Sequence, residues 1–415
     1  MGREVDKKQE EVVLSRSERT VVLLGTLDTK GREYAFLRER LREHGVDVLV
    51  VDAGVHEPVG IEPDIPRTEV SSDVARLAEA GDRGAAVSAM GKGAAEVVQR
   101  LHREGRLDGI LALGGSGGSS IAAAAMRGLP VGVPKLIVST VASGDTRPYV
   151  GAVDVAMMYS VVDIAGVNSI SARIMANAAG AIAGMAKASV PALEQKPLVG
   201  ATMFGVTTPC VTRARERLEE LGYEVLVFHA TGTGGQSMEA LVRGGFLAGV
   251  LDVTTTELAD ELVGGVLSAG PDRLEGAGEL GLPQVVSLGA LDMVNFGPRE
   301  TVPPQFEGRN LYVHNPTVTL MRTTPEECRE LGRQIGRKLS AARGPTALYV
   351  PLLGVSMIAV EGQPFHDADA DAALLDGLHE TLDGVEVHEL ELDVNDERFA
   401  VAMADRLHEL IGEGA

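Results

Sequence analysis

Residues 20–52 read TVVLLGTLDTKGREYAFLRERLREHGVDVLVVD and contain one complete βαβ pattern. The short β-branched run Thr20–Gly25 ends in glycine, and a segment with helical periodicity follows from Glu33 to His44. A glycine then ends the helix, and the apolar run Val46–Val51 ends in Asp52. Strand, loop, helix and strand in this order predict part of a parallel sheet.

The same pattern continues along the first half of the chain. Gly109–Leu113 and Lys135–Thr140 are predicted strands, and an alanine-rich helix over Ser119–Gly128 lies between them. A glycine- and alanine-rich helix over Ser169–Lys187 follows. Because strands alternate with helices, this half is predicted to be a Rossmann-like domain.

The order of elements then starts again. Leu198–Met203 is a predicted strand, a helix follows around Val211–Leu221, and the strand Tyr223–Phe228 ends in His229. Later landmarks recur in the same order in both halves, although generic α/β patterning could mimic any one of them. The predicted fold is α/β, with two tandem Rossmann-like domains and mainly parallel sheets. We expect a flexible leader over residues 1–19, a nucleotide-binding domain over 20–193 and a second domain over 194–415.

Composition excludes several classes of protein. The chain has 415 residues and a net charge of −21, which disfavours binding to nucleic acid or to an anionic membrane surface. Any phosphate site must therefore be built locally from backbone N–H groups, a few cations or a metal. Cys210 and Cys328 lack metal-ligand spacing, and no apolar run approaches 18 residues without interruption. We expect a cytoplasmic protein.

The loop after the first predicted strand is a candidate phosphate and Mg²⁺ site, because it offers hydroxyls, a carboxylate and an ammonium before a helix. Helix capping by Asp28 or Thr29 is the alternative. Asp52, at the end of the second strand, is a candidate ribose ligand. Neither a P-loop motif nor a dinucleotide fingerprint occurs in this turn. The candidate residues of the loop are Gly25, Thr26, Leu27, Asp28, Thr29 and Lys30.

A second loop, rich in glycine, gives the strongest single signal. Its glycines would let the backbone approach a phosphate and direct N–H groups at it, although a tight strand-to-helix turn would need the same residues. Its candidate residues are Gly114, Gly115, Ser116, Gly117, Gly118 and Ser119.

Two further segments are candidates in the first half. Thr140, Ser143, Gly144 and Asp145 follow another strand, and either Asp28 or Asp145 is expected to contribute to a Mg²⁺ site. Gly91 and Lys92, expected to precede a helix, are a weaker phosphate candidate.

In the second half, a glycine loop begins at His229, and Asp252 and Glu257 follow another strand. His229 with Asp252 or Glu257 could be an acid–base pair. Capping and satisfied hydrogen bonding explain these residues equally well.

The loop GTLDTKG over 25–31 also carries a resemblance to a known family. It is supported by HATGTGG over 229–235, TTTELADE over 254–261, SLGALDMVNF over 287–296 and HNPTVTLMRTT over 314–324. With these motifs the chain resembles the amino-terminal ATP-binding domain of the tomato mosaic virus resistance protein and its microbial relatives. The resemblance covers about residues 20–410. It implies two Rossmann-like subdomains, ATP binding in the first, and dimerisation; antiviral activity does not transfer with it.

Three functions are compatible with these observations. The first is an ATP-binding homo-oligomer that also uses Mg²⁺, and the second is an interaction module that nucleotide binding controls without chemistry. The third is a hydrolase or isomerase that acts on a small phosphorylated or sugar-like metabolite through His229 and Asp252.

Overall fold

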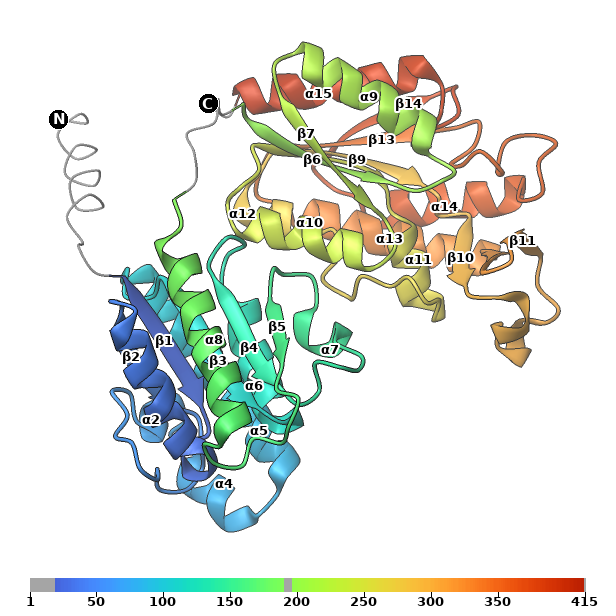
Figure 1. The fold of residues 1–415 in the computed structure, drawn as a ribbon. Coiled ribbons are helices and arrows are strands. Elements are labelled where there is room, and N and C mark those ends of the chain that lie inside the picture. The colour runs from blue at the N-terminus through green and yellow to red at the C-terminus, as the bar shows by residue number, and fades with distance from the viewer. Residues whose placement is uncertain (1–18, 190–195, 414–415) are drawn as a thin grey trace, which may run out of the picture. The chain divides into compact units, whose positions relative to one another are not determined.

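A computed structural model describes residues 19–189 and 196–413 of the chain (Figure 1). The chain divides into two compact units, Met1–Ala192 and Leu193–Ala415. Except for Arg19, the predicted leader lies outside the described residues, as does most of the junction between the predicted domains. Both units are α/β structures with parallel main sheets, so the predicted tandem Rossmann-like fold is confirmed.

The first unit has a five-stranded parallel sheet in the order β2-β1-β3-β4-β5. β1 and β2 are the strands of the opening pattern, and they pair in register from Thr20 with Asp47 to Gly25 with Asp52. The strands are β1 (Thr20–Gly25), β2 (Asp47–Asp52), β3 (Gly109–Gly114), β4 (Lys135–Ser139) and β5 (Ala156–Tyr159).

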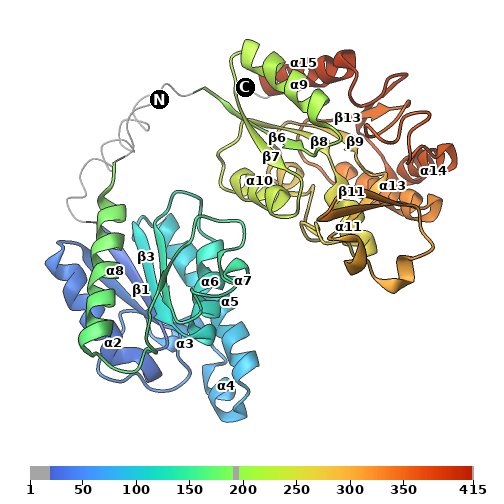
Figure 2. The same ribbon diagram turned by 45° about the vertical axis from the view of Figure 1, so that its right-hand side comes forward.

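Helices cover both faces of this sheet, as Figures 1 and 2 show. α2 (Leu27–Glu43) and α8 (Ser169–Lys187) pack on one face, and α5 (Arg83–Arg103) and α6 (Ser116–Arg127) pack on the other. Alternate strand residues therefore enter two separate apolar cores, as expected for a doubly wound sheet. Short helices complete the unit: α3 (Arg67–Val70), α4 (Val74–Ala80) and α7 (Arg147–Val150).

The second unit has a six-stranded parallel sheet in the order β14-β13-β9-β8-β6-β7. Its strands are β6 (Leu198–Met203), β7 (Glu224–His229), β8 (Gly249–Thr254), β9 (Gln284–Gly289), β13 (Thr346–Pro351) and β14 (Glu386–Leu390). A small antiparallel sheet in the order β10-β12-β11 is inserted after β9, and it was not predicted from the sequence. Its strands are β10 (Met293–Phe296), β11 (Leu311–Asn315) and β12 (Val318–Arg322).

Helices also cover both faces of the six-stranded sheet. α9 (Thr208–Glu220) and α15 (Glu397–Glu413) lie on one side, and α10 (Thr233–Arg243) and α13 (Pro325–Ser340) lie on the other (Figure 1). The remaining α-helices are α11 (Thr256–Val263), α12 (Gly276–Leu280) and α14 (Ala368–Thr381). The two cysteines are buried in separate cores, Cys210 within α9 and Cys328 within α13.

The structure corrects the placement of Gly91 and Lys92. The sequence pattern predicts them before a helix, but they lie inside α5. A Cβ atom at Gly93 would lie 1.8 Å from the carbonyl oxygen of Val70, and one at Gly91 would lie 3.2 Å from Cβ of Ala124. These glycines therefore permit close packing around α5, and Lys92 is exposed on its surface.

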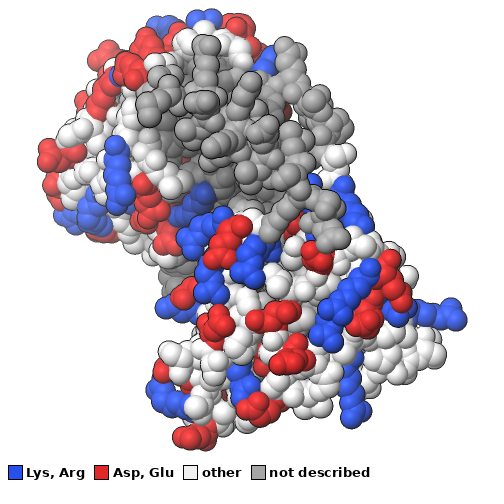
Figure 3. All heavy atoms as spheres, turned by 90° about the vertical axis from the view of Figure 1, so that its left-hand side faces the viewer, with Lys and Arg blue, Asp and Glu red and all other residues white. Residues whose placement is uncertain are grey.

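Two properties of the surface agree with the composition. Among the described helices, no segment combines the length and apolar character that a membrane span needs. On the face drawn in Figure 3, basic and acidic side chains are interspersed.

Candidate functional site

The first unit contains a cavity of about 410 Å³ at the carboxyl ends of β1, β2 and β3. The strand order places β1 beside β3, with β2 on the other side of β1. Connections leave β1 and β3 in opposite directions here, and Rossmann-type sheets bind ligands in the crevice that results. The polar and glycine residues that line the cavity include Thr26, Asp28 and Thr29 after β1, Gly54 and His56 after β2, Asp82 and Arg83 at the start of α5, and Gly117 and Gly118 in α6.

The predicted glycine loop forms the first turn of α6. Gly115 is the N-cap residue, no described side chain caps the helix, and its first turn contains no acidic residue. The first N–H groups of any helix have no intrahelical acceptor, and at this helix start Gly117 and Gly118 line the cavity. Such an end carries partial positive charge and is suited to an anion.

Arg83 supplies a full positive charge beside this turn. A Cβ atom at Gly117 would lie 3.5 Å from Nη2 of Arg83, so the guanidinium group stands next to the start of α6. Arg83 was not predicted, because nothing in its local sequence distinguishes it from other surface arginines. Only the tertiary structure brings the start of α5 beside that of α6.

Asp28 is the predicted metal ligand that lines the cavity. Its Oδ2 accepts hydrogen bonds from the N–H groups of Val55 and His56, each at 3.1 Å. Its Oδ1 is buried and has no hydrogen-bond partner among the described residues. One carboxylate oxygen is thus oriented by the backbone, and the other has no described hydrogen-bond partner.

Asp52, the predicted ribose ligand, is buried and does not line the cavity. Its Oδ1 accepts from the N–H groups of Leu27 at 3.3 Å and Gly54 at 2.9 Å, so it joins the end of β2 to the start of α2. Burial raises the pKa of Asp52, and the nearby charge of Asp28 raises it further. The structure gives Asp52 a supporting position below the cavity.

The other residues of the first loop are divided between the cavity and the core. Thr26 and Thr29 line the cavity, and their hydroxyl oxygens lie 3.0 Å apart. Gly25 and Leu27 are buried, and Nζ of Lys30 donates to the carbonyl oxygen of Ile164 instead of facing the cavity.

The segment after β4 contributes little to the cavity. Thr140 borders the glycine loop, since its Oγ1 would lie 3.6 Å from a Cβ atom at Gly115. Ser143, Gly144 and Asp145 are exposed and are not among the described residues that line the cavity. Arg147 binds both carboxylate oxygens of Asp145, at 2.9 and 2.8 Å, and this contact lowers the pKa of Asp145. Ser119 is also directed away, because its buried hydroxyl lies 2.6 Å from that of Ser139.

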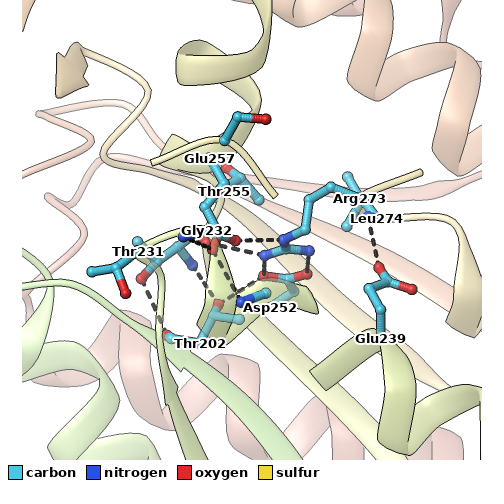
Figure 4. Close-up of polar contacts among 12 residues, drawn as sticks. Thr202, Thr231, Gly232, Glu239, Asp252, Thr255, Glu257, Arg273 and Leu274 are labelled. Atoms are coloured by element: carbon cyan, nitrogen blue, oxygen red, sulfur yellow. Dashed lines mark hydrogen bonds and ion pairs between the residues drawn. The ribbon is translucent and has the colours of Figure 1, made fainter. Parts of the chain in front are cut away.

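The second unit has a buried ionic cluster in the corresponding region (Figure 4). Arg273 is fully buried and donates to both carboxylate oxygens of Asp252, at 2.5 and 2.7 Å, and to Oε2 of Glu257 at 2.7 Å. Burial alone would lower the pKa of Arg273, but the carboxylates of Asp252, Glu257 and Glu239 raise it. Arg273 therefore remains charged and neutralises part of the cluster.

Glu257 also fills the helix end that follows the second glycine loop. Its Oε1 accepts from the N–H groups of Gly232 at 2.7 Å and Gly235 at 3.0 Å, at the start of α10 (Figure 4). Satisfied hydrogen bonding, the alternative left open by the sequence, thus describes both Asp252 and Glu257. His229 lines a different cavity, together with His314 and Phe204.

Comparison with known proteins identifies the family. Residues 19–191 match the N-terminal domain of the uncharacterised protein family UPF0261, and residues 196–411 match its C-terminal domain. A UPF0261 protein of Clostridium tetani is 55% identical over 394 residues, which cover 93% of this chain and 98% of the relative. The chain therefore belongs to the UPF0261 family.

A plant protein and a solved structure are also similar. The ToMV resistance protein Tm-1(GCR237) of Solanum lycopersicum is 40% identical over 418 residues, covering 94% of this chain and 55% of that protein. The predicted resemblance to the tomato protein and to microbial relatives is confirmed. A putative UDP-N-acetylglucosamine 2-epimerase from Listeria monocytogenes is 13% identical, with coverage of 88% of this chain and 96% of that one and a TM-score of 0.26.

Proposed function

We propose that this member of the UPF0261 family binds ATP, or a similar nucleotide, in the cavity of the first unit, with the phosphates at the first turn of α6. The observation that carries the proposal is the pairing of an uncapped helix end with Arg83 inside one cavity. Backbone N–H groups and a guanidinium group are the usual protein ligands of phosphate.

The charge of a triphosphate gives Asp28 a role. The chain has a net charge of −21, and Arg83 is the one Lys or Arg among the described residues that line the cavity. A bound Mg²⁺ would offset the remaining phosphate charge, and carboxylate and hydroxyl oxygens are the ligands it prefers. Asp28 and Thr29 would hold it, because both line the cavity and Oδ1 of Asp28 has no other described partner.

The apolar part of the cavity lining suits a nucleobase. Its lining includes the apolar side chains of Leu77, Val87, Met90 and Ile121, against which an aromatic ring could pack. The volume of about 410 Å³ lies within the range of roughly 300–1,000 Å³ that is common for small-molecule sites.

We also propose a homo-oligomer in a cytoplasmic setting. The buried side chains of α8, among them Met175, Ala179 and Ile182, pack against its own sheet. Large apolar side chains are instead exposed shortly before and at the start of α8: Tyr159, Val161, Val167 and Ile170. A monomer mass by light scattering at micromolar concentration would contradict the oligomer.

Calorimetric titration with ATP, with and without EDTA, tests the nucleotide site and its metal. We expect ATP to bind much more weakly when EDTA removes Mg²⁺, and Asp28→Asn to weaken Mg-ATP binding in the same way. Asp145→Asn is the matched control, because Asp145 is exposed and paired with Arg147. Equal ATP affinity with and without EDTA would contradict the metal. If ATP does not bind to the folded protein, the nucleotide site itself is wrong.

A further inference from the structure

The second unit has its own cavity, of about 250 Å³, at the carboxyl ends of β6 and β7. The turn after β6, the segment that contains Leu267 and the β11–β12 hairpin enclose it. None of these elements belongs to the first unit, so this cavity is independent of the proposed nucleotide site.

The rim of this cavity carries three hydrogen-bond donors. His229 and His314 are exposed on it, and neither imidazole has a hydrogen-bond partner among the described residues. The side-chain oxygen of Asn315 accepts from N–H and Oγ1 of Thr317, at 2.8 and 2.9 Å, which leaves the NH₂ group of Asn315 to donate outward. No acidic residue is present among the described residues of the lining, so the rim favours an anion.

The interior of the cavity is apolar. Phe204, Leu267 and Val318 form much of it, and the ring of Phe204 lies 5.6 Å from that of His229 at an interplanar angle of 52°. Two tilted rings offer edge and face contacts to a third flat ring. A ligand that fills this space needs an apolar body, and a flat aromatic body can pack against the rings that line the cavity.

A phosphate group does not match this rim. The N–H groups of Gly232 and Gly235 at the start of α10 are bonded to Glu257, so this helix end offers no phosphate cradle beside His229. Imidazole and amide donors suit the flat carboxylate group, which accepts two or three directed hydrogen bonds.

We propose that this cavity binds a small carboxylate with an apolar, preferably aromatic, body, and that His229, His314 and Asn315 hold its carboxylate group. The carboxylate lies at the rim, and the body lies against Phe204, Leu267 and Val318.

Calorimetric titration of the full chain with benzoate tests the proposal. We expect one saturable site per chain, and binding of benzyl alcohol about tenfold weaker or more because it lacks the charged acceptor. His229→Ala and His314→Ala should each weaken benzoate binding about five- to tenfold. His379→Ala is the matched control, since His379 is exposed on α14 and pairs with Glu389.

Saturation with Mg-ATP separates this site from the nucleotide site, and benzoate affinity should not change when ATP is present. Circular dichroism of each variant confirms that it is folded. The proposal is wrong if benzoate does not saturate at millimolar concentrations, or if benzyl alcohol or inorganic phosphate binds as tightly as benzoate. Unchanged affinity in both folded histidine variants, or competition with ATP, would also overturn it.

Discussion

The two parallel sheets have matching strands at one edge, β2-β1-β3 in the first unit and β7-β6-β8 in the second. α6 follows β3, and α11 follows the matching strand β8. The first turn of α6 is glycine-rich and contains no acid, whereas the first turn of α11 contains Glu257. The helices before these strands also correspond. α5, before β3, begins with Arg83, whereas α10, before β8, begins with glycines whose N–H groups Glu257 binds.

This difference decides which helix end can accept a ligand. In the first unit, the N–H groups of α6 and the guanidinium group of Arg83 face a cavity. In the second unit, the N–H groups of Gly232 and Gly235 already bind a carboxylate that Arg273 holds in place. A glycine-rich loop therefore provides N–H donors, but the nearest carboxylate determines whether a ligand can use them.

The largest effect is expected when the buried ionic cluster of the second unit is disrupted. Arg273→Ala would leave Asp252 and Glu257 buried without their cation, and loss of one partner of a buried ionic group costs about 3–5 kcal/mol. Urea denaturation should show a loss of this size in the free energy of unfolding. The surface variant Arg329→Ala, which breaks ion pairs with Asp376 and Glu380, should cost about 1 kcal/mol or less. Equal losses in the two variants would mean that the cluster does not stabilise the second unit.

A second prediction concerns the segment that covers the filled loop. Asp260 accepts hydrogen bonds from the N–H groups of Leu267 and Asn295, and the carbonyl oxygen of Ser268 lies 2.7 Å from the position of a Cβ atom at Gly232. Burial raises the pKa of Asp260 from 3.8 to about 7. The folded chain then holds a proton that the unfolded chain has released between these values.

The stability that neutral Asp260 contributes is complete below pH 3.8 and is lost as the pH rises to about 7. In Asp260→Asn, the new side-chain NH₂ group needs an acceptor. The side-chain amide of Asn295 can flip so that its Oδ1, which has no described partner, accepts from this NH₂ group. The native chain should lose stability relative to this variant by about 1.4 kcal/mol for each unit of pKa shift. Urea denaturation of both proteins at several pH values is the measurement. A constant difference would show that Asp260 does not titrate in this range.

The third prediction concerns a variant that disrupts the proposed nucleotide site of the first unit. A side chain in Gly117→Val would enter the cavity beside Arg83 and displace the phosphates. Loss of two or three charge-assisted hydrogen bonds should weaken ATP binding by about a hundredfold or more in calorimetry. Lys92→Ala, on the exposed side of α5, should leave the affinity unchanged. Unchanged ATP affinity in a folded Gly117→Val protein would show that this loop is a structural turn that does not bind the phosphates.

The smallest effect is expected for the loss of the Arg83 side chain. Arg83→Ala removes one exposed guanidinium group from the edge of the cavity and should weaken ATP binding about tenfold. Arg147→Ala removes another exposed arginine, which binds Asp145, and it should not alter ATP affinity. If the two variants behave alike, Arg83 contributes only general charge.

Local patterns were sufficient to predict the fold. The strand at Thr20–Gly25 coincides with the prediction, because β-branched residues and a terminal glycine specify it locally. The start of α2 was predicted six residues too late, at Glu33, because Leu27–Lys30 look like a loop in sequence but form the first helical turn. The β10–β12 sheet was missed, since its pairing depends on contacts that the sequence pattern does not encode.

The candidate site was predictable only in part. Asp28 and Gly117 face one cavity because they follow neighbouring strands of a parallel sheet, which the sequence implies. Arg83 and the ionic partner of Asp252 were not predictable, because helix packing and a long loop place them. In the second unit, the N–H group of Gly235 is occupied by Glu257, a residue 22 positions away, and the local sequence does not show this hydrogen bond.

The comparison of the two helix ends is tested most directly by the backbone amide chemical shifts of Gly117, Gly118, Gly232 and Gly235 during a titration with Mg-ATP. If the account is correct, the amide signals of Gly117 and Gly118 shift and saturate with ATP, while those of Gly232 and Gly235 stay in place because Glu257 already binds their N–H groups. Saturable shifts at Gly232 and Gly235, with Gly117 and Gly118 unchanged, would contradict it.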